Sequence, residues 1–152
     1  MEFKGVEKGE LLKHTLSTGN VFLGDFKGID HKKFFIIIGL SSEKIYFCSV
    51  YINSNIPKYI YSNKILLNLQ VNIKGSKYDF LKYDSFVSCN DPLKYDVSDL
   101  VTWINNGICK YVGDIDTEDL ENITTTVINS GVLKQKDIDT FFNGKNQSLD
   151  KK

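Results

Sequence analysis

The stretch that decides the fold is 20-NVFLGDFKGIDHKKFFIIIGLSSEKIYFCSVYIN-53. Val21–Phe26 has the period-two alternation of a half-buried strand, whereas Phe34–Leu40 is a nearly continuous run of β-branched and aromatic residues. That run predicts a central strand buried on both faces. The short polar sequence Ser41-Ser42-Glu43 then predicts a tight hairpin into a third strand over Lys44–Ile52.

Short strands are expected to continue as far as Cys89. Asn53–Asn63 is polar and predicts an exposed loop, and Ile65–Ile73 predicts a strand. Tyr78–Leu81 and Ser85–Cys89 predict two further short strands around a turn. A string of short strands joined by small turns favours a compact β-barrel.

The hydrophobic period changes from two to that of a helix after Asp91-Pro92. Three helices and one strand are expected: a helix capped by Asp96 or Ser98 and ending at Gly107, a strand over Cys109–Val112, a helix capped by Asp116 and ending at Gly131, and a short helix near Gln135–Phe142. Trp103 is expected to pack the first of these helices onto the barrel. We therefore expect one domain over residues 1–152, mainly β with α: a small SH3-like β-barrel over 19–89, a helical C-terminal extension over 90–142 and a flexible tail over 143–152.

The composition is that of one soluble domain, with 41% hydrophobic and 25% charged residues in a chain of 152. The longest apolar run, Phe34–Leu40, is too short to cross a bilayer, and the first ten residues have no apolar core of a signal peptide. A cytoplasmic protein without a membrane partner is expected. Cys48, Cys89 and Cys109 are odd in number and widely spaced, so we expect buried apolar side chains rather than disulfides or a zinc site.

All 19 basic residues are lysines, and the chain contains neither arginine nor alanine. Together with many Asn, Ile and Lys residues, this suggests an AT-rich genome, such as that of a Gram-positive bacterium, a phage or a mobile element. Without a guanidinium group, a phosphate would be held by lysines, backbone amides or hydroxyls. Up to Cys89 the chain has 12 lysines against 8 acidic residues, and after it 7 against 11. An anionic ligand is therefore expected on the first half, although a solvated lysine surface has the same composition.

Asp30-His31-Lys32-Lys33 is the strongest cluster of chemically useful side chains. A histidine can transfer protons near neutral pH, and lysines can bind a phosphate or stabilise developing negative charge. Asp25 on the preceding strand is expected to face the same loop. The alternative is a charged hairpin tip that only promotes solubility.

Asp84-Ser85 is the second notable pair, because its side chains either satisfy turn amides or line a cleft beside the hairpin. Aromatic residues also alternate with lysines on the expected barrel strands, a pattern that stacks single-stranded bases or fills an aromatic core. The sequence has no glycine-rich phosphate loop, metal-ligand spacing or nucleophile elbow, so neither a metal nor a cofactor is expected.

The segments GNVFLGDF, KKFFIIIGLSS and KIYFCSVYIN, separated by a polar loop, resemble the start of the growth-inhibiting toxins of the MazF/PemK type. The resemblance covers about Gly19–Cys89. It implies a MazF/PemK-like β-barrel, metal-independent endoribonuclease activity on single-stranded RNA, a homodimer and a small antitoxin partner.

On this resemblance the family's catalytic arginine falls at Lys33, and the serine or threonine that ends the second strand falls at Ser41 or Ser42. His31 or Asp25 would take the 2′-hydroxyl proton while Lys33 stabilises the phosphorane. Lys27, Lys32, Asp84 and Ser85 are expected to bind the substrate. Because lysine does not replace the arginine fork, a non-catalytic barrel that binds a protein or nucleic acid is the alternative.

Overall fold

The computed structural model describes residues 11–29 and 31–142. Residues 11–15 are helical, and 3-10 turns occupy Ser42–Lys44 and Gly75–Lys77. The strands are β1 (Asn20–Gly24), β2 (Lys33–Leu40), β3 (Tyr46–Asn53), β4 (Gln70–Ile73), β5 (Ser85–Ser88), β6 (Leu93–Asp96) and β7 (Cys109–Asp114), and the helices are α2 (Lys58–Tyr61), α3 (Lys64–Leu67), α4 (Val97–Asn105), α5 (Thr117–Ser130) and α6 (Gln135–Phe141).

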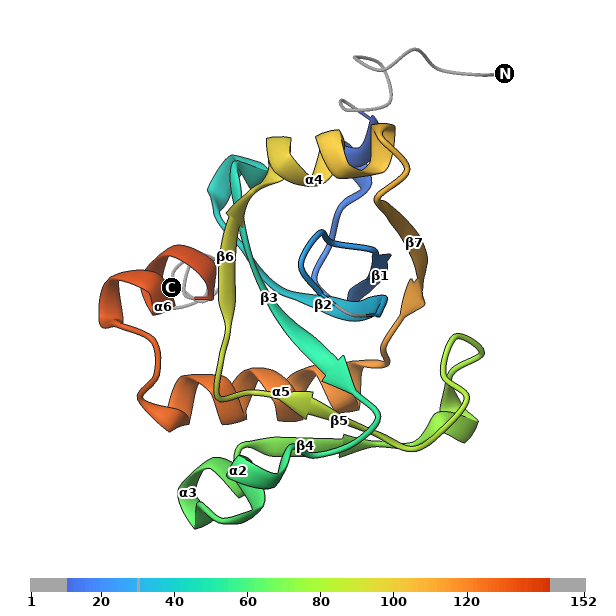
Figure 1. The fold of residues 1–152 in the computed structure, drawn as a ribbon. Coiled ribbons are helices and arrows are strands. Elements are labelled where there is room, and N and C mark those ends of the chain that lie inside the picture. Colours follow the sequence, from blue (N-terminus) through green and yellow to red (C-terminus); the bar gives the residue numbers. More distant parts are fainter. Residues whose placement is uncertain (1–10, 30, 143–152) are drawn as a thin grey trace.

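All seven strands belong to one antiparallel sheet. Six of them follow the order β4-β5-β3-β2-β1-β7, and β6 lies off this path and pairs with β3. The long strand β3 organises it, because its first half pairs with β6 and its last two residues pair with β5. The closed barrel expected from the sequence is wrong. The helix α4 spans the opening between β6 and β7, which do not pair with each other in the described chain (Figure 1).

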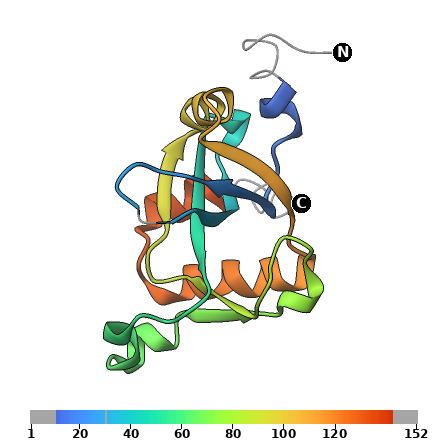
Figure 2. The same cartoon turned by 45° about the vertical axis from the view of Figure 1, so that its right-hand side comes forward.

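The sheet is covered on both faces, which gives two hydrophobic cores. Ile36 and Ile38 of β2 face α5 and α6, whereas Phe35 and Ile37 face α4. All four side chains are at most 3% exposed, so the expected central strand buried on both faces is confirmed. Figure 2 shows α5 (orange) lying alongside β4 (green).

Local signals set the helices after the sheet. The Asp116 carboxylate accepts a hydrogen bond from the Asp119 amide, and Gly131 ends α5 with a left-handed φ of 79°. Trp103 of α4 packs edge-on against the rings of Phe26 and Tyr95, at centroid distances of 5.0 and 5.2 Å. These three features confirm the predicted cap, stop and packing residue.

Several expected elements differ from the structure. The predicted exposed loop over Asn53–Asn63 contains α2, and the first half of the predicted strand Ile65–Ile73 is α3. Tyr78–Leu81 forms turns rather than a strand. The unexpected strand β6 and the longer β7 carry the sheet beyond residue 89, into the part expected to be a helical extension. The predicted tail over 143–152 lies outside the described residues.

Candidate functional site

A cleft of about 490 Å³ opens where β2 begins and β3 ends, facing the loop that leads into β5. Three segments distant in sequence form it. Its lining residues are His31, Lys32, Lys33, Phe34, Ile52, Asn53, Ser54, Asn55, Ile56, Pro57, Phe80, Leu81, Lys82, Tyr83 and Ser85. The antiparallel pairing of Phe34 with Ile52 places Lys33 and Asn53 side by side at the floor.

The cleft has apolar and aromatic walls, and its polar lining side chains are cationic or neutral. Three lysines and His31 lie around it, with the amides of Asn53 and Asn55 and the hydroxyls of Ser54 and Ser85. No aspartate or glutamate lies among the described residues that line it. The excess of lysines over acidic residues up to Cys89 predicted an anionic ligand on this half of the chain. Three of those lysines lie together in the cleft, which favours an anionic ligand there.

Lys33 is partly buried, whereas the other two lysines of the cleft are exposed. Its Nζ donates a hydrogen bond to the Asn53 Oδ1 and lies 5.7 Å from the centroid of the Tyr51 ring. Partial burial lowers the pKa of Lys33 below its ordinary value, because desolvation disfavours the ammonium. No ion pair joins Lys33 to a carboxylate anywhere in residues 11–29 and 31–142.

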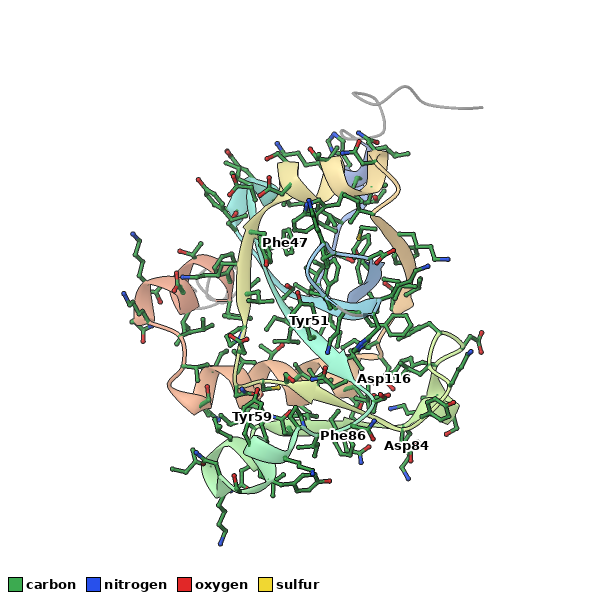
Figure 3. The ribbon with its side chains drawn as sticks, viewed as in Figure 1. Phe47, Tyr51, Tyr59, Asp84, Phe86 and Asp116 are labelled. Carbon is green, nitrogen blue, oxygen red and sulfur yellow. The ribbon has the colours of Figure 1, made fainter. Side chains whose placement is uncertain are left out.

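The opposite wall is a firmly held loop that presents an exposed aromatic ring. The Gly75 amide donates to the Asp84 carboxylate at 2.9 Å, and the Ser85 hydroxyl donates to the Tyr83 carbonyl at 2.9 Å. A Cβ at Gly75 would come within 2.6 Å of the Tyr83 backbone, so the two chain segments are in close contact. Yet the Tyr83 side chain is 67% exposed. Figure 3 shows Asp84 at the outer margin of the sheet and Tyr51 over its middle.

The structure brings four of the eight expected site residues into this cleft: His31, Lys32, Lys33 and Ser85. Asp25 and Lys27 are exposed in the segment after β1 and do not line it. Asp84 accepts from a turn amide, as one of the two interpretations of Asp84-Ser85 predicted. Asp30 lies outside the described residues.

Ser41 lies at the other end of β2 from Lys33. Ser41 follows Lys33 by eight positions along the extended chain, a span of about 26 Å. The Ser41 hydroxyl accepts a hydrogen bond from the Tyr46 amide at 2.9 Å and is part of the hairpin turn. It does not join the cleft. The catalytic group Asp25, His31, Lys33 and Ser41 is therefore not assembled around one point.

Asn53, Lys82 and Tyr83 line the cleft but were not foreseen as site residues. Asn53 had only a partial signal, because pairing the predicted hairpin from its turn places Tyr51 opposite Lys33, and the longer observed turn and the irregularity between Ile37 and Gly39 bring Asn53 there instead. Lys82 and Tyr83 had none, since their loop reaches the cleft only through tertiary contacts.

A larger cavity, of about 630 Å³, lies between the first described helical turn, α4 and β7. It has an apolar floor that includes Leu12, Phe22 and Ile104. None of the site residues expected from the sequence lines it. For that reason the smaller, cationic cleft is the better candidate site.

Among the described residues, no group of three or more His, Cys, Asp or Glu side chains is arranged to hold a metal ion. None of their helices has both the length and the apolar character needed to span a membrane.

Comparison with known protein families finds no family that matches this chain. Comparison with curated proteins likewise gives no match.

Proposed function

We propose that the cleft binds single-stranded RNA. The observation that supports this most directly is the grouping of His31, Lys32, Lys33 and Lys82 around one opening, with no carboxylate among its described lining residues. A positively charged groove that follows a phosphate backbone is the common feature of proteins that bind single strands.

The aromatic side chains favour an unpaired strand over a duplex. The Tyr83 ring is exposed although its backbone is held by neighbouring hydrogen bonds, and it lies in the same cleft as the lysines. The Phe80 ring is less available, because it packs against Phe34 at a centroid distance of 5.5 Å. A flat, exposed ring beside cations suits stacking of a base that has no Watson–Crick partner.

Binding should be measured by fluorescence anisotropy with a labelled RNA of mixed sequence. A length of about ten nucleotides is within the range that small single-strand-binding domains cover. Lys33→Ala and Lys82→Ala are expected to weaken binding about tenfold each, by the loss of a charged hydrogen bond to phosphate. Tyr83→Leu should weaken it by a similar factor, by the loss of stacking.

Matched controls lie far from the cleft. Lys136→Ala on α6 removes one exposed lysine, and Tyr46→Leu replaces a tyrosine that is 48% exposed at the opposite end of β3. Both should bind RNA as the wild type does. The proposal is overturned if the wild type has no affinity for the RNA, or if the control variants lose as much affinity as the cleft variants.

Metal-independent RNA cleavage is a second candidate function, favoured by the presence of His31 and Lys33 in one cleft. A neutral His31 imidazole would take the 2′-hydroxyl proton, and the 2′-oxygen would attack phosphorus. The bond from phosphorus to the 5′-oxygen would then break, and that oxygen would take a proton from solvent. Lys33 would stabilise the phosphorane.

This candidate agrees with the resemblance to MazF/PemK-type toxins, as do a homodimer and an antitoxin partner. It predicts a 2′,3′-cyclic phosphate product formed in the presence of a chelator and abolished by His31→Ala. RNA that stays intact while bound would favour the non-catalytic alternative, a binding module of the same fold.

A further inference from the structure

Within residues 11–29 and 31–142, the groups that hold the Lys33 ammonium are neutral. Its hydrogen-bond acceptor is the Asn53 amide oxygen, and its other close neighbour is the π face of Tyr51. Both attract a cation, but neither cancels its charge. A half-buried lysine is commonly paired with a carboxylate, and such a pair would have little attraction left for a phosphate.

Asn53 has its orientation fixed by the residues behind it. Its Nδ2 donates to the Ser88 Oγ at 2.5 Å, and the Ser88 hydroxyl lies 3.4 Å from the Gln70 Oε1, to which it donates. The Gln70 Nε2 in turn donates to the Asn90 Oδ1 at 2.7 Å and to the Leu66 carbonyl at 3.2 Å.

Lys33, Asn53, Ser88, Gln70 and Asn90 form a series of hydrogen bonds in which each residue donates to the next, away from the cleft. An ammonium group can only donate, so the oxygen of Asn53 must face Lys33 and its nitrogen must face Ser88. The residues come from four neighbouring strands, β2, β3, β5 and β4, and from the turn after β5. Aligned hydrogen bonds of this kind polarise and strengthen one another. The sheet therefore presents a fixed acceptor at the cleft floor.

We infer that Asn53 is a positioning residue: it holds the Lys33 ammonium at the cleft floor without a countercharge from the described part of the chain, so that the ammonium can pair with a phosphate of the bound RNA. This inference rests on the proposed function for the identity of the anion. The placement of Lys33 by Asn53 is a separate claim that can be tested without RNA.

Asn53→Asp is the decisive variant because it keeps the shape of the side chain and adds the missing countercharge. It should weaken RNA binding about tenfold, as expected when one charged hydrogen bond is lost. It should also lower the slope of log K against log salt by about 0.7, the value for one phosphate contact on a single strand. The pKa of Lys33, followed through its Cε resonance and assigned by its absence in Lys33→Ala, should rise.

Asn55→Asp is the matched control. Asn55 lines the same cleft two residues further on and makes no hydrogen bond or ion pair with Lys33, so this variant adds the same charge without that contact. It should leave the Lys33 pKa near that of the wild type and weaken RNA binding less than Asn53→Asp does.

A second pair of variants tests the support behind Asn53. Ser88→Ala removes the acceptor for the Asn53 amide and should weaken RNA binding by a few fold, about the effect of one neutral hydrogen bond. Ser88→Thr keeps the hydroxyl and should restore the affinity. If these hydrogen bonds only stabilised the fold, Ser88→Ala and Ser88→Thr would both lower the free energy of unfolding, and the two variants would bind RNA with the same affinity.

The inference is overturned if Asn53→Asp binds RNA as the wild type does, or if Asn53→Asp and Asn55→Asp change the Lys33 pKa and the salt slope equally. If the wild type binds no RNA, the proposed function fails. In that case the Lys33 resonance still tests whether Asn53 positions the Lys33 ammonium. A rise of the Lys33 pKa in Asn53→Asp but not in Asn55→Asp supports this positioning, and the absence of such a rise overturns it.

Discussion

Gly39 in β2 lies directly against Phe141 in α6: a Cβ at position 39 would come within 2.7 Å of the Phe141 Cβ and 3.2 Å of its carbonyl oxygen. Pairing between β2 and β3 is irregular between Ile37 and Gly39. The contact brings the last described helix close to the central strand, and it depends on the absence of a side chain at Gly39.

Gly39→Ala is therefore expected to lower the free energy of unfolding by about 1–3 kcal/mol, the usual effect of overpacking a core. Urea unfolding followed by circular dichroism measures it, and hydrogen exchange should show the largest loss of protection in α6. Gly107→Asn is a suitable control, because Gly107 has a left-handed φ of 74° that asparagine tolerates and no atom within 4 Å of an added Cβ. Equal stability of Gly39→Ala and the wild type would contradict the close contact.

The three cysteines are expected to be inert in the native protein. Cys48, Cys89 and Cys109 are buried, as predicted from their spacing, and burial raises the pKa of each thiol to about 12. Because the thiolate is the reactive form, a disulfide reagent at pH 8 should label none of them until the protein unfolds in urea, when all three should react. Rapid labelling of a native thiol would show that its burial is wrong.

The first turn of α5 should show a defined pH dependence. The Lys77 Nζ lies 2.6 Å from the Asp116 carboxylate, and this contact lowers the pKa of Asp116 below its ordinary value of 3.8. A lowered carboxyl pKa means stabilisation that is present at neutral pH and lost as the pH falls through the lowered pKa. The difference in urea midpoint between the wild type and Asp116→Asn should thus be full at pH 7, begin to fall below about pH 4 and be smallest at about pH 2, as the pH passes through the lowered pKa of Asp116.

Asn is used at position 116 because it keeps the N-cap and removes only the charge. Glu121→Gln on the exposed face of the same helix is the control, and its midpoint should follow that of the wild type at both pH values. A difference for Asp116→Asn that is unchanged between pH 7 and about pH 2 would argue against the ion pair.

The parts of the fold that local sequence determines were predictable. The apolar run of β2 and the cap and stop of α5 act within a few residues, so the sequence alone indicates them. The strand expected over Ile65–Ile73 is confirmed only for its last four residues, which form β4. Its start is α3, because the Asn63 side chain accepts hydrogen bonds from the Ile65 and Leu66 amides. The short strand β6 was missed because its pairing with β3 defines it more than its own four residues do.

Some residues of the candidate site could likewise be predicted from the sequence, and others could not. Residue type indicates Lys33 and the loop before it, whereas the place of Asn53 depends on the longer observed turn and on the irregularity between Ile37 and Gly39. Tyr83 and Lys82 reach the cleft because long-range contacts, such as that of Lys77 with Asp119 at 3.0 Å, place their loop. No periodicity within residues 74–84 encodes those contacts, so the wall of the cleft was visible only in the structure.

Ser41 is a residue for which the two hypotheses predict different results. It lies outside the proposed RNA-binding cleft, whereas the MazF/PemK resemblance implies that it belongs to the active site. Its hydroxyl supports the hairpin at the far end of β2, so Ser41→Ala should lower the free energy of unfolding by about 1 kcal/mol, the value of one hydrogen bond. RNA affinity should stay at the wild-type level, in contrast to Lys33→Ala.

The exposed neighbour Ser42 is the control for Ser41, and Ser42→Ala should change neither stability nor affinity. Anisotropy and urea titrations on the same samples distinguish the two effects. If Ser41→Ala lost RNA binding or cleavage as fully as Lys33→Ala while remaining folded, both ends of β2 would have to contact the RNA. A cleft confined to one end of β2 would then be too small, and the active surface would have to extend along the strand as the resemblance implies.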